Sequence, residues 1–127
     1  MEIKVGIKNR VDDVVTVNNV ASAIGSGGIS VYATPWMVAL MEKASLTAIA
    51  PFLDKGFDSV GTKISTSHLS ATPIGMKIYA EAEVIEVDRK RIVFSVKAYD
   101  ERGLIGEGEH ERFIIDTEKF LEKTNKK

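Results

Sequence analysis

The sequence predicts an α+β fold in which an antiparallel sheet wraps around one long central helix. The segment 34–50 is almost entirely apolar, which is typical of a helix that the rest of the domain encloses. The segments after it alternate apolar and polar side chains, as strands do, and short turns separate the later ones. Connections of hairpin length join antiparallel strands, so we expect the sheet to be antiparallel.

Proline residues mark both ends of the predicted helix. Thr34 and Pro35 predict its start, because a Thr hydroxyl can cap free N–H groups and Pro suits the first helical position. Pro51 predicts its end, since a proline disfavours helical geometry in the residue before it. Helical spacing then gives the stripe of residues expected to be most deeply buried, which is Met37, Met41, Ala44 and Ala48.

Glu42 is the anomalous residue of this helix. Its helical neighbours are Val38, Leu46 and Ile49, which places a carboxylate in apolar surroundings. A carboxylate there resists ionisation unless another group holds it, and such residues are candidates for catalysis. The alternative interpretation is that Glu42 lies at the edge of the helix and reaches water.

The segment before the helix predicts less regular structure. A first strand is expected within residues 2–17, broken near Asn9. A short turn of helix is expected over residues 20–24, and the glycine-rich residues 25–28 follow it. A loop of this kind resembles phosphate-binding loops, but no Gly-Lys-Ser or Gly-Lys-Thr follows, so a nucleotide site is not expected.

Four strands are expected after the helix. The first starts at Val60 and has one face formed by Val60, Thr62, Ile64, Thr66 and His68. The next two cover residues 76–87 and 91–100, with inward side chains Ile78, Ala80, Ala82, Val84, Ile92, Phe94, Val96 and Ala98.

The fourth strand covers residues 104–115 and has two chemically different faces. His110 and Arg112 share one of them. Glu107, Glu109 and Glu111 lie on the other, which is expected to face solvent. Asp116 is placed to cap a final amphipathic helix that carries Phe120 and Leu121.

Length and composition predict one domain over residues 1–127, with residues 123–127 as a frayed tail. The chain has no Cys, which excludes disulfides, thiolate metal sites and a Cys nucleophile. A net charge of −1 argues against nucleic acid as a partner. The first ten residues lack the apolar run of a signal peptide and no segment could span a bilayer, so we expect a cytoplasmic protein.

Several short segments together resemble a known family. They keep their order and spacing over roughly residues 12–121, and they are 31–35, 41–44, 60–62, 67–69, 72–75 and 108–112. This set resembles the hotdog-fold acyl-CoA thioesterases related to fluoroacetyl-CoA thioesterase. Each segment alone is weakly specific, and the whole set is specific. The resemblance implies a hotdog fold, an acyl-CoA substrate, a homodimer or larger homo-oligomer, and no cofactor or metal beyond the CoA of the substrate.

The resemblance also implies a set of catalytic residues. A Thr just before the helix, a Glu within it and a His on the following strand fall on Thr34, Glu42 and His68. It further implies a Gly61 N–H near the reacting carbonyl, and contact between Arg112 and the CoA phosphates. Structural interpretations stand beside these roles: Thr34 as a helix cap, His68 as an ordinary strand histidine, and Arg112 in a surface ion pair.

These residue types suit thioester hydrolysis. Glu42 could attack the carbonyl to give a mixed anhydride, or act as general base on water, and the sequence leaves both routes open. His68 can orient that carboxylate or relay a proton, since an ordinary histidine pKa of ~6.5 lies near working pH. Gly61 allows an acyl group to approach the backbone closely.

The spacing of Thr34 and Glu42 constrains the site. They are eight residues apart in sequence, which is about 12 Å along an ideal helix, so their side chains cannot touch within one regular helix. Either the loop before the helix folds back, or the site combines Thr34 of one subunit with Glu42 of its partner.

The acyl group is not identified by the sequence. A pocket that discriminates fluorine on a two-carbon acyl group needs bulky apolar side chains over it, and residues 25–28 cannot provide them. Two other functions are weighed: a hotdog hydratase-dehydratase acting on enoyl or hydroxyacyl thioesters, and a non-enzymatic acyl-CoA-binding module. The absence of Asp and His from residues 25–33 counts against the first. The set Thr34, Glu42 and His68 counts against the second.

Overall fold

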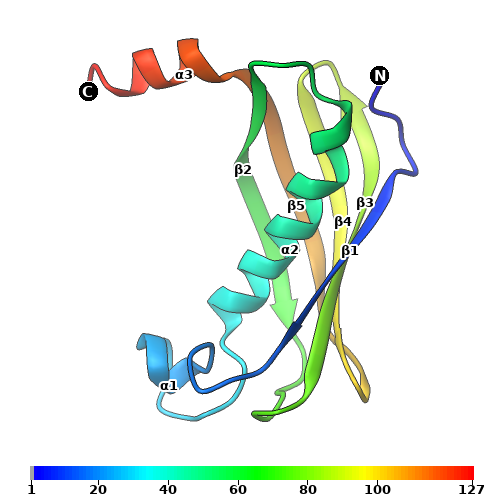
Figure 1. Ribbon diagram of the computed structural model, residues 1–127. Coiled ribbons are helices and arrows are strands. Elements are labelled where there is room, and N and C mark those ends of the chain that lie inside the picture. The colour runs from blue at the N-terminus through cyan, green and yellow to red at the C-terminus, as the bar shows by residue number, and fades with distance from the viewer. Residues whose placement is uncertain (1) are drawn as a thin grey trace.

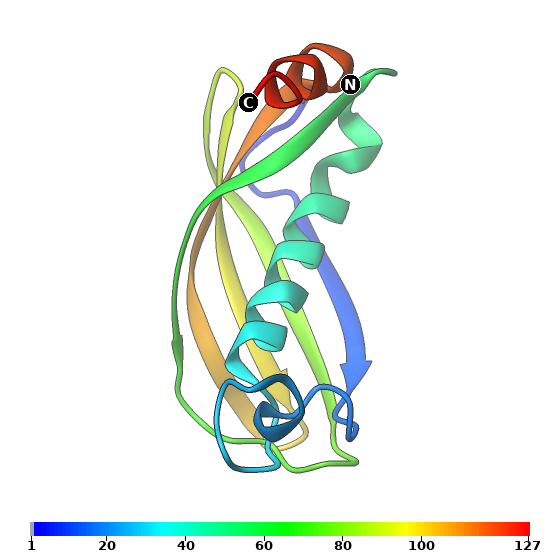
Figure 2. The same ribbon diagram turned by 90° about the vertical axis from the view of Figure 1, so that its left-hand side faces the viewer.

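The computed structural model describes residues 2–127, which form a five-stranded antiparallel sheet curved around one long helix (Figure 1, Figure 2). The strand order is β1-β3-β4-β5-β2, so β1 and β2 are the two edges. The predicted fold class is therefore confirmed. The strands are β1 (Lys8–Val14), β2 (Phe57–His68), β3 (Lys77–Asp88), β4 (Arg91–Asp100) and β5 (Gly103–Asp116). The helices are α1 (Ala21–Ile24), α2 (Thr34–Ile49), the 3₁₀ turn η1 (Ala50–Phe52) and α3 (Thr117–Thr124).

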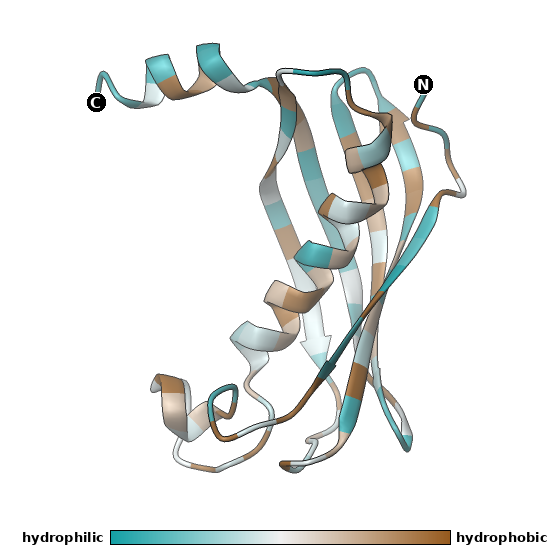
Figure 3. Cartoon of the chain, viewed as in Figure 1, coloured by the Kyte–Doolittle hydropathy of each residue, from teal (hydrophilic) through white to brown (hydrophobic). Residues whose placement is uncertain are grey.

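The helix α2 supplies one side of the core. The predicted stripe of Met37, Met41, Ala44 and Ala48 is buried, and so are the predicted inward side chains of β3 and β4. Figure 3 shows a hydrophilic band across the middle of α2, where the sequence has Glu42 and Lys43. The helix stops where Pro51 predicts, and the chain continues into η1. The apolar face of α2 thus packs on the sheet, and a single carboxylate interrupts its flank.

Two predictions at the N-terminal side are wrong. The first strand is not broken near Asn9, which pairs with Ala82 inside β1. The chain turns instead at Gly6, whose φ of +99° favours glycine. Thr34 does not cap α2: Ala33 occupies the N-cap, no side chain caps this end, and Thr34 is the first helical residue. Its hydroxyl is therefore free for a different contact.

A β-bulge in β2 overturns the predicted face of that strand at Thr62, while Ile64, Thr66 and His68 keep their common face. The pairing with β5 shifts between Gly61 and Lys63, so Thr62 has no register partner. Thr62 turns outward, where its hydroxyl donates to the Glu111 carboxylate at 2.6 Å. Gly61 faces α2, because a Cβ built on it would lie 3.5 Å from Glu42 Oε2. Gly61 and His68 are seven residues apart and would lie on opposite faces of a regular strand, whereas the extra residue brings both to the helix side.

Two glycines of β5 allow β2 and α2 to approach closely. A Cβ on Gly108 would lie 2.0 Å from the carbonyl oxygen of Ser65, and one on Gly106 would lie 2.5 Å from Met37 Sδ. Any side chain at these positions would push β2 or α2 away from β5. These glycines therefore help to fix where β2, and with it His68, lies relative to the helix.

The helix α3 projects away from the sheet beyond the edge strand β2 (Figure 1). Asp116 caps it as predicted, by accepting a hydrogen bond from the Lys119 N–H at 3.2 Å. Phe120 and Leu121 are exposed on it. No helix within residues 2–127 is long and apolar enough to cross a membrane.

Candidate active site

Thr34 and His68 form a direct pair at one end of the helix. Thr34 Oγ1 lies 2.6 Å from His68 Nδ1, although the residues are 34 positions apart in sequence. Thr34 is at the first position of α2, and His68 is the last residue of β2. The other ring nitrogen, His68 Nε2, is buried and has no hydrogen-bond partner among residues 2–127. A buried polar atom without a partner costs stability, and it is the kind of atom that a ligand or water satisfies.

A second cluster forms around Gly61, near the other end of β2. A Cβ built on Gly61 would lie 3.1 Å from His110 Cε1, 3.4 Å from Arg112 Nη1 and 3.5 Å from Glu42 Oε2. A carboxylate, a guanidinium and an imidazole therefore converge on one point beside the Gly61 backbone. Glu42 is half-buried, with the half-buried Val38 and Leu46 one helical turn to either side. It is thus neither an ordinary core residue nor freely solvated.

Arg112 is buried, with 6% of its surface exposed, and so does not form the surface ion pair that was one interpretation. Its Nε donates to Ser59 Oγ at 2.8 Å and its Nη2 to the Ser59 carbonyl at 2.9 Å. Its Nη1 donates to His110 Nε2 at 3.1 Å. Contact with the CoA phosphates would require this guanidinium to leave its present partners.

The two clusters lie far apart within one chain. Gly61 and His68 are separated by seven residues of β2, about 23 Å less the shortening at the bulge. Thr34 and Glu42 are about 12 Å apart along the helix axis, because α2 is regular between them. The structure thus brings Thr34 to His68, and Glu42 to Gly61 and Arg112, but it does not bring these two groups together in one subunit.

Burial alters the charge states of both histidines. Burial lowers the pKa of His68 below its ordinary 6.5, although hydrogen bonding with the Ser70 backbone opposes the shift. The pKa of His110 is also lowered, by burial and by the neighbouring Arg112, against opposing effects of the Lys63 carbonyl, Glu42 and Glu111. Both rings are therefore neutral at neutral pH and can accept a proton or a hydrogen bond.

Sequence reasoning missed two residues of these clusters. Ser59 anchors Arg112, and its position two residues before Gly61 on the same strand face could have indicated this. Tyr32 is buried with its hydroxyl unpartnered, and its ring meets the His68 ring edge-on at a centroid distance of 6.5 Å. No sequence signal distinguishes Tyr32 from an ordinary core aromatic residue. Ser59 thus adds a polar group to the cluster around Gly61, and Tyr32 adds one beside the Thr34–His68 pair; the residue pattern predicted neither.

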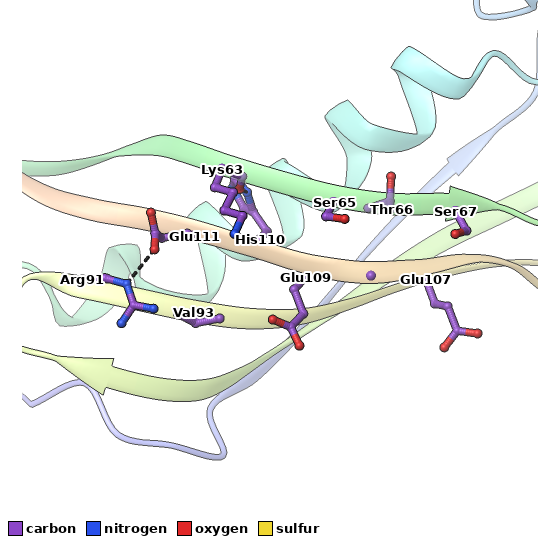
Figure 4. Close-up of a pocket in the computed structure, with 11 residues that line it drawn as sticks. Lys63, Ser65, Thr66, Ser67, Arg91, Val93, Glu107, Glu109, His110 and Glu111 are labelled. Carbon is purple, nitrogen blue, oxygen red and sulfur yellow. Dashed lines mark hydrogen bonds and ion pairs between the residues drawn. The ribbon is translucent and has the colours of Figure 1, made fainter.

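A hollow of the surface lies elsewhere, on the outer face of the sheet (Figure 4). It measures about 490 Å³ and is lined by the predicted solvent-facing row of Glu107, Glu109 and Glu111. Arg91 pairs with Glu111 there at 2.6 Å. Neither Thr34 nor Glu42 reaches this face, so the hollow is not the candidate active site.

Comparison with known proteins agrees with the family resemblance of the sequence. A sequence model of the fluoroacetyl-CoA-specific thioesterases matches residues 15–118. The fluoroacetyl-CoA thioesterase of Streptantibioticus cattleyicolor is 43% identical over 97 residues, which cover 76% of this chain and 70% of that protein.

Solved structures agree in fold. A structure of the fluoroacetyl-CoA thioesterase is 35% identical and superposes with a TM-score of 0.93 over 100% of this chain and 98% of that one. A variant of the same enzyme in complex with acetyl-CoA gives a TM-score of 0.92 at 35% identity, covering 98% of each chain. A thioesterase superfamily member from Thermus thermophilus is 31% identical with a TM-score of 0.91, covering 98% of this chain and 93% of that one. The chain therefore belongs to the fluoroacetyl-CoA-specific thioesterase family and is a thioester hydrolase of the hotdog fold.

Proposed function

We propose that this chain hydrolyses acyl-CoA thioesters at a site shared between two subunits of a homodimer. One subunit contributes Thr34 and His68, and the other contributes Glu42 with Gly61 and Arg112. The observation that carries the proposal is the separation of these two groups. Thr34 contacts His68 at the end of β2, whereas Glu42 lies beside Gly61 in the first half of β2. Among the described strands, β2 is an edge strand with no partner on its outer side. An exposed edge of this length is a template for pairing with a second chain.

Pairing of β2 with the β2 of a second copy would bring the two halves together. In antiparallel pairs, residues directly opposite each other have side chains on the same face. A twofold axis at Ser65 pairs Ile64 with Thr66 of the partner subunit. If the two residues of the bulge, Gly61 and Thr62, are counted as one position, the same axis pairs Gly61 with His68 of the partner subunit. Each Thr34–His68 pair then lies beside the partner's Glu42, on the helix side of a continuous sheet.

A disulfide cross-link tests this register. In a Ser65→Cys variant the two new thiols face each other across the axis, at a Cα separation of about 5 Å, within the range that a disulfide spans. The natural chain has no Cys, so any cross-link must come from this position. We expect mild oxidation to convert the variant to a covalent dimer on non-reducing gels.

The matched control for the cross-link is Ser67→Cys. Ser67 is exposed on the same strand, but four residues of strand separate it from its symmetry mate, about 13 Å. This variant is expected to remain monomeric on the same gel. Equal cross-linking of both variants, or of neither, would contradict the register at Ser65.

The proposed chemistry uses each group in a defined role. The Glu42 carboxylate attacks the thioester carbonyl, or takes a proton from the water that attacks it. In this proposal Arg112 and the Gly61 N–H donate to the negative charge that develops on the carbonyl oxygen, and such a donor contributes roughly 2.7–4 kcal/mol in typical enzymes. Neutral His68, bonded to Thr34, keeps Nε2 for the substrate, for water or for the carboxylate of the partner.

We further propose that the acyl pocket is open and not restricted to two carbons. Gly25 and Gly28 would have no atom within 4 Å of an added Cβ, so the loop before α2 presents open space. A set of short, branched, aromatic and medium-chain acyl-CoAs is expected to release free CoA thiol, with more than one acyl class turned over. Thiol release measured with a disulfide dye reports this directly. Turnover of fluoroacetyl-CoA alone would contradict the open pocket.

The same assay separates the alternatives. A binding module would bind acyl-CoA without releasing thiol, whereas a hydratase would change the absorbance of an enoyl-CoA while the thioester stayed intact. The pairing of Thr34 with His68 and the convergence of Glu42 and Arg112 on Gly61 favour the hydrolase. Absence of thiol release across the whole set, from a folded protein, would overturn the proposed activity.

A further inference from the structure

His110 is a buried histidine in which both ring nitrogens are committed. Only 2% of its surface is exposed, and its ring stacks on Phe94 at a centroid distance of 6.2 Å. Nδ1 lies 2.8 Å from the Lys63 carbonyl, which can only accept, so Nδ1 carries the hydrogen. Nε2 lies 3.1 Å from Arg112 Nη1, which can only donate, so Nε2 is unprotonated. The two contacts together define the neutral Nδ1–H tautomer.

In the described part of the chain, the acceptors that hold the Arg112 guanidinium are all uncharged. These are the Ser59 hydroxyl, the Ser59 carbonyl and His110 Nε2. Within residues 2–127 its nitrogens form no ion pair at 4.0 Å or less. Yet Arg112 Nη1 and Glu42 Oε2 lie 3.4 and 3.5 Å from the same point beside Gly61, so a movement of the guanidinium by about 3 Å at most would close such a pair.

We propose that His110 is a positioning residue, whose unprotonated Nε2 holds the Arg112 guanidinium beside Gly61 and keeps it from pairing directly with Glu42. This inference rests on the proposed function. A direct pair would be strong, because Arg and carboxylate form short charge-assisted hydrogen bonds. Such a pair would occupy the Glu42 lone pairs that attack the carbonyl or accept a proton. It would also use the N–H groups of Arg112 that would otherwise donate to the substrate.

Burial and the Arg112 charge favour the neutral ring that the proposal requires, against the opposing effects of Glu42 and Glu111. The charged groups on the side of the ring are Arg112, on the same face of β5, and Glu42 on α2, while β2 contributes the Lys63 carbonyl. Glu111, next to His110 in sequence, points to the outer face of the sheet. Protonation of Nε2 would remove the acceptor that Arg112 Nη1 now uses and would set two cations in contact. Burial and Arg112 oppose that protonation.

Two substitutions separate the two contacts of the ring. His110→Gln places an amide oxygen near the position of Nε2 and so retains an acceptor for Arg112. His110→Asn places its amide near Nδ1, which retains the bond to the Lys63 carbonyl and leaves Arg112 without its acceptor. We expect His110→Asn to lower kcat by about ten- to a hundredfold with little change in KM, the size of a lost hydrogen bond to a charged group. We expect His110→Gln to retain most of the activity. Ser45→Ala, which removes a buried hydroxyl bonded only within α2, is the matched control and should leave kcat unchanged.

A double-mutant cycle tests whether His110 acts through Arg112. In an Arg112→Met background, His110→Asn should cause no further loss of kcat. Independent, multiplicative losses, or equal losses in the Gln and Asn variants, would overturn the proposal and leave His110 with a packing role.

A spectroscopic measurement does not depend on turnover. The ¹⁵N spectrum of the histidine rings at neutral pH should show His110 with a protonated Nδ1 and an unprotonated Nε2. A proton on Nε2 would overturn the proposal even in an active enzyme. If the wild type hydrolysed none of the acyl-CoAs, the proposed function would fail, and the ring spectrum would still decide whether His110 accepts from Arg112.

Discussion

Replacing Glu42 by Gln is expected to reduce kcat by roughly 10²–10⁴-fold, the range typical of a lost general base. The substitution keeps the length and shape of the side chain and removes its charge. Glu42 is half-buried beside Gly61, so the amide can occupy the same space without disturbing the apolar stripe of α2. The loss should therefore appear in turnover, measured as thiol release, while the circular dichroism spectrum and melting temperature stay close to those of the wild type.

The matched control for this substitution is Glu109→Gln. Glu109 is exposed on the outer face of β5, so its substitution makes the same change in charge away from the helix side. It should leave turnover unchanged. If Glu42→Gln kept activity close to that of the wild type, Glu42 would return to the interpretation of a helix-edge residue.

Single-turnover hydrolysis in H₂¹⁸O tests whether Glu42 is the nucleophile. If Glu42 is the nucleophile, water cleaves the mixed anhydride and ¹⁸O can enter the Glu42 carboxylate. If it is the general base, water attacks the thioester carbonyl directly and all of the ¹⁸O appears in the released acid. Mass spectrometry of the peptide that contains Glu42 detects label in that carboxylate, which only the nucleophilic route introduces, when water cleaves the anhydride at the Glu42 carbonyl.

Much of the fold could be predicted because it depends on local patterns. The period of α2 identified its buried stripe, and Pro51 identified its end. Alternation along β3 and β4 identified their inward residues. The thioesterase resemblance was supported by the family match over residues 15–118. For the helix and the strands a single element carries the signal, and for the family it is the order and spacing of short segments, so no knowledge of long-range contacts was needed.

The features that could not be predicted depend on contacts between distant segments. The bulge at Gly61 and Lys63 follows from the pairing of β2 with β5, and strict alternation along β2 placed Thr62 on the wrong face. Thr34 appeared suited to cap the helix, because the sequence does not reveal that His68 lies 2.6 Å from its hydroxyl. Likewise, the burial of Arg112 depends on Ser59 and His110, which lie on two different strands.

Mixing two inactive variants is expected to restore activity if the site is shared between subunits. A heterodimer of Thr34→Ala and Glu42→Gln subunits has one site that carries both lesions. Its other site combines the native Thr34 of one subunit with the native Glu42 of the other. With free exchange of subunits in an equal mixture, about half of the dimers are heterodimers with one intact site of two, so about a quarter of wild-type activity should return.

This mixing experiment tests the shared site most directly when it is run beside a second mixture, of Thr34→Ala with His68→Ala. Thr34 and His68 come from the same subunit, so both sites of that heterodimer carry a lesion and it should stay inactive. Subunit exchange is verified in both mixtures by co-purification of two different affinity tags. Recovery of thiol release in the first mixture and not in the second is the result that a shared site predicts. No recovery in the first mixture, despite verified exchange, would contradict it.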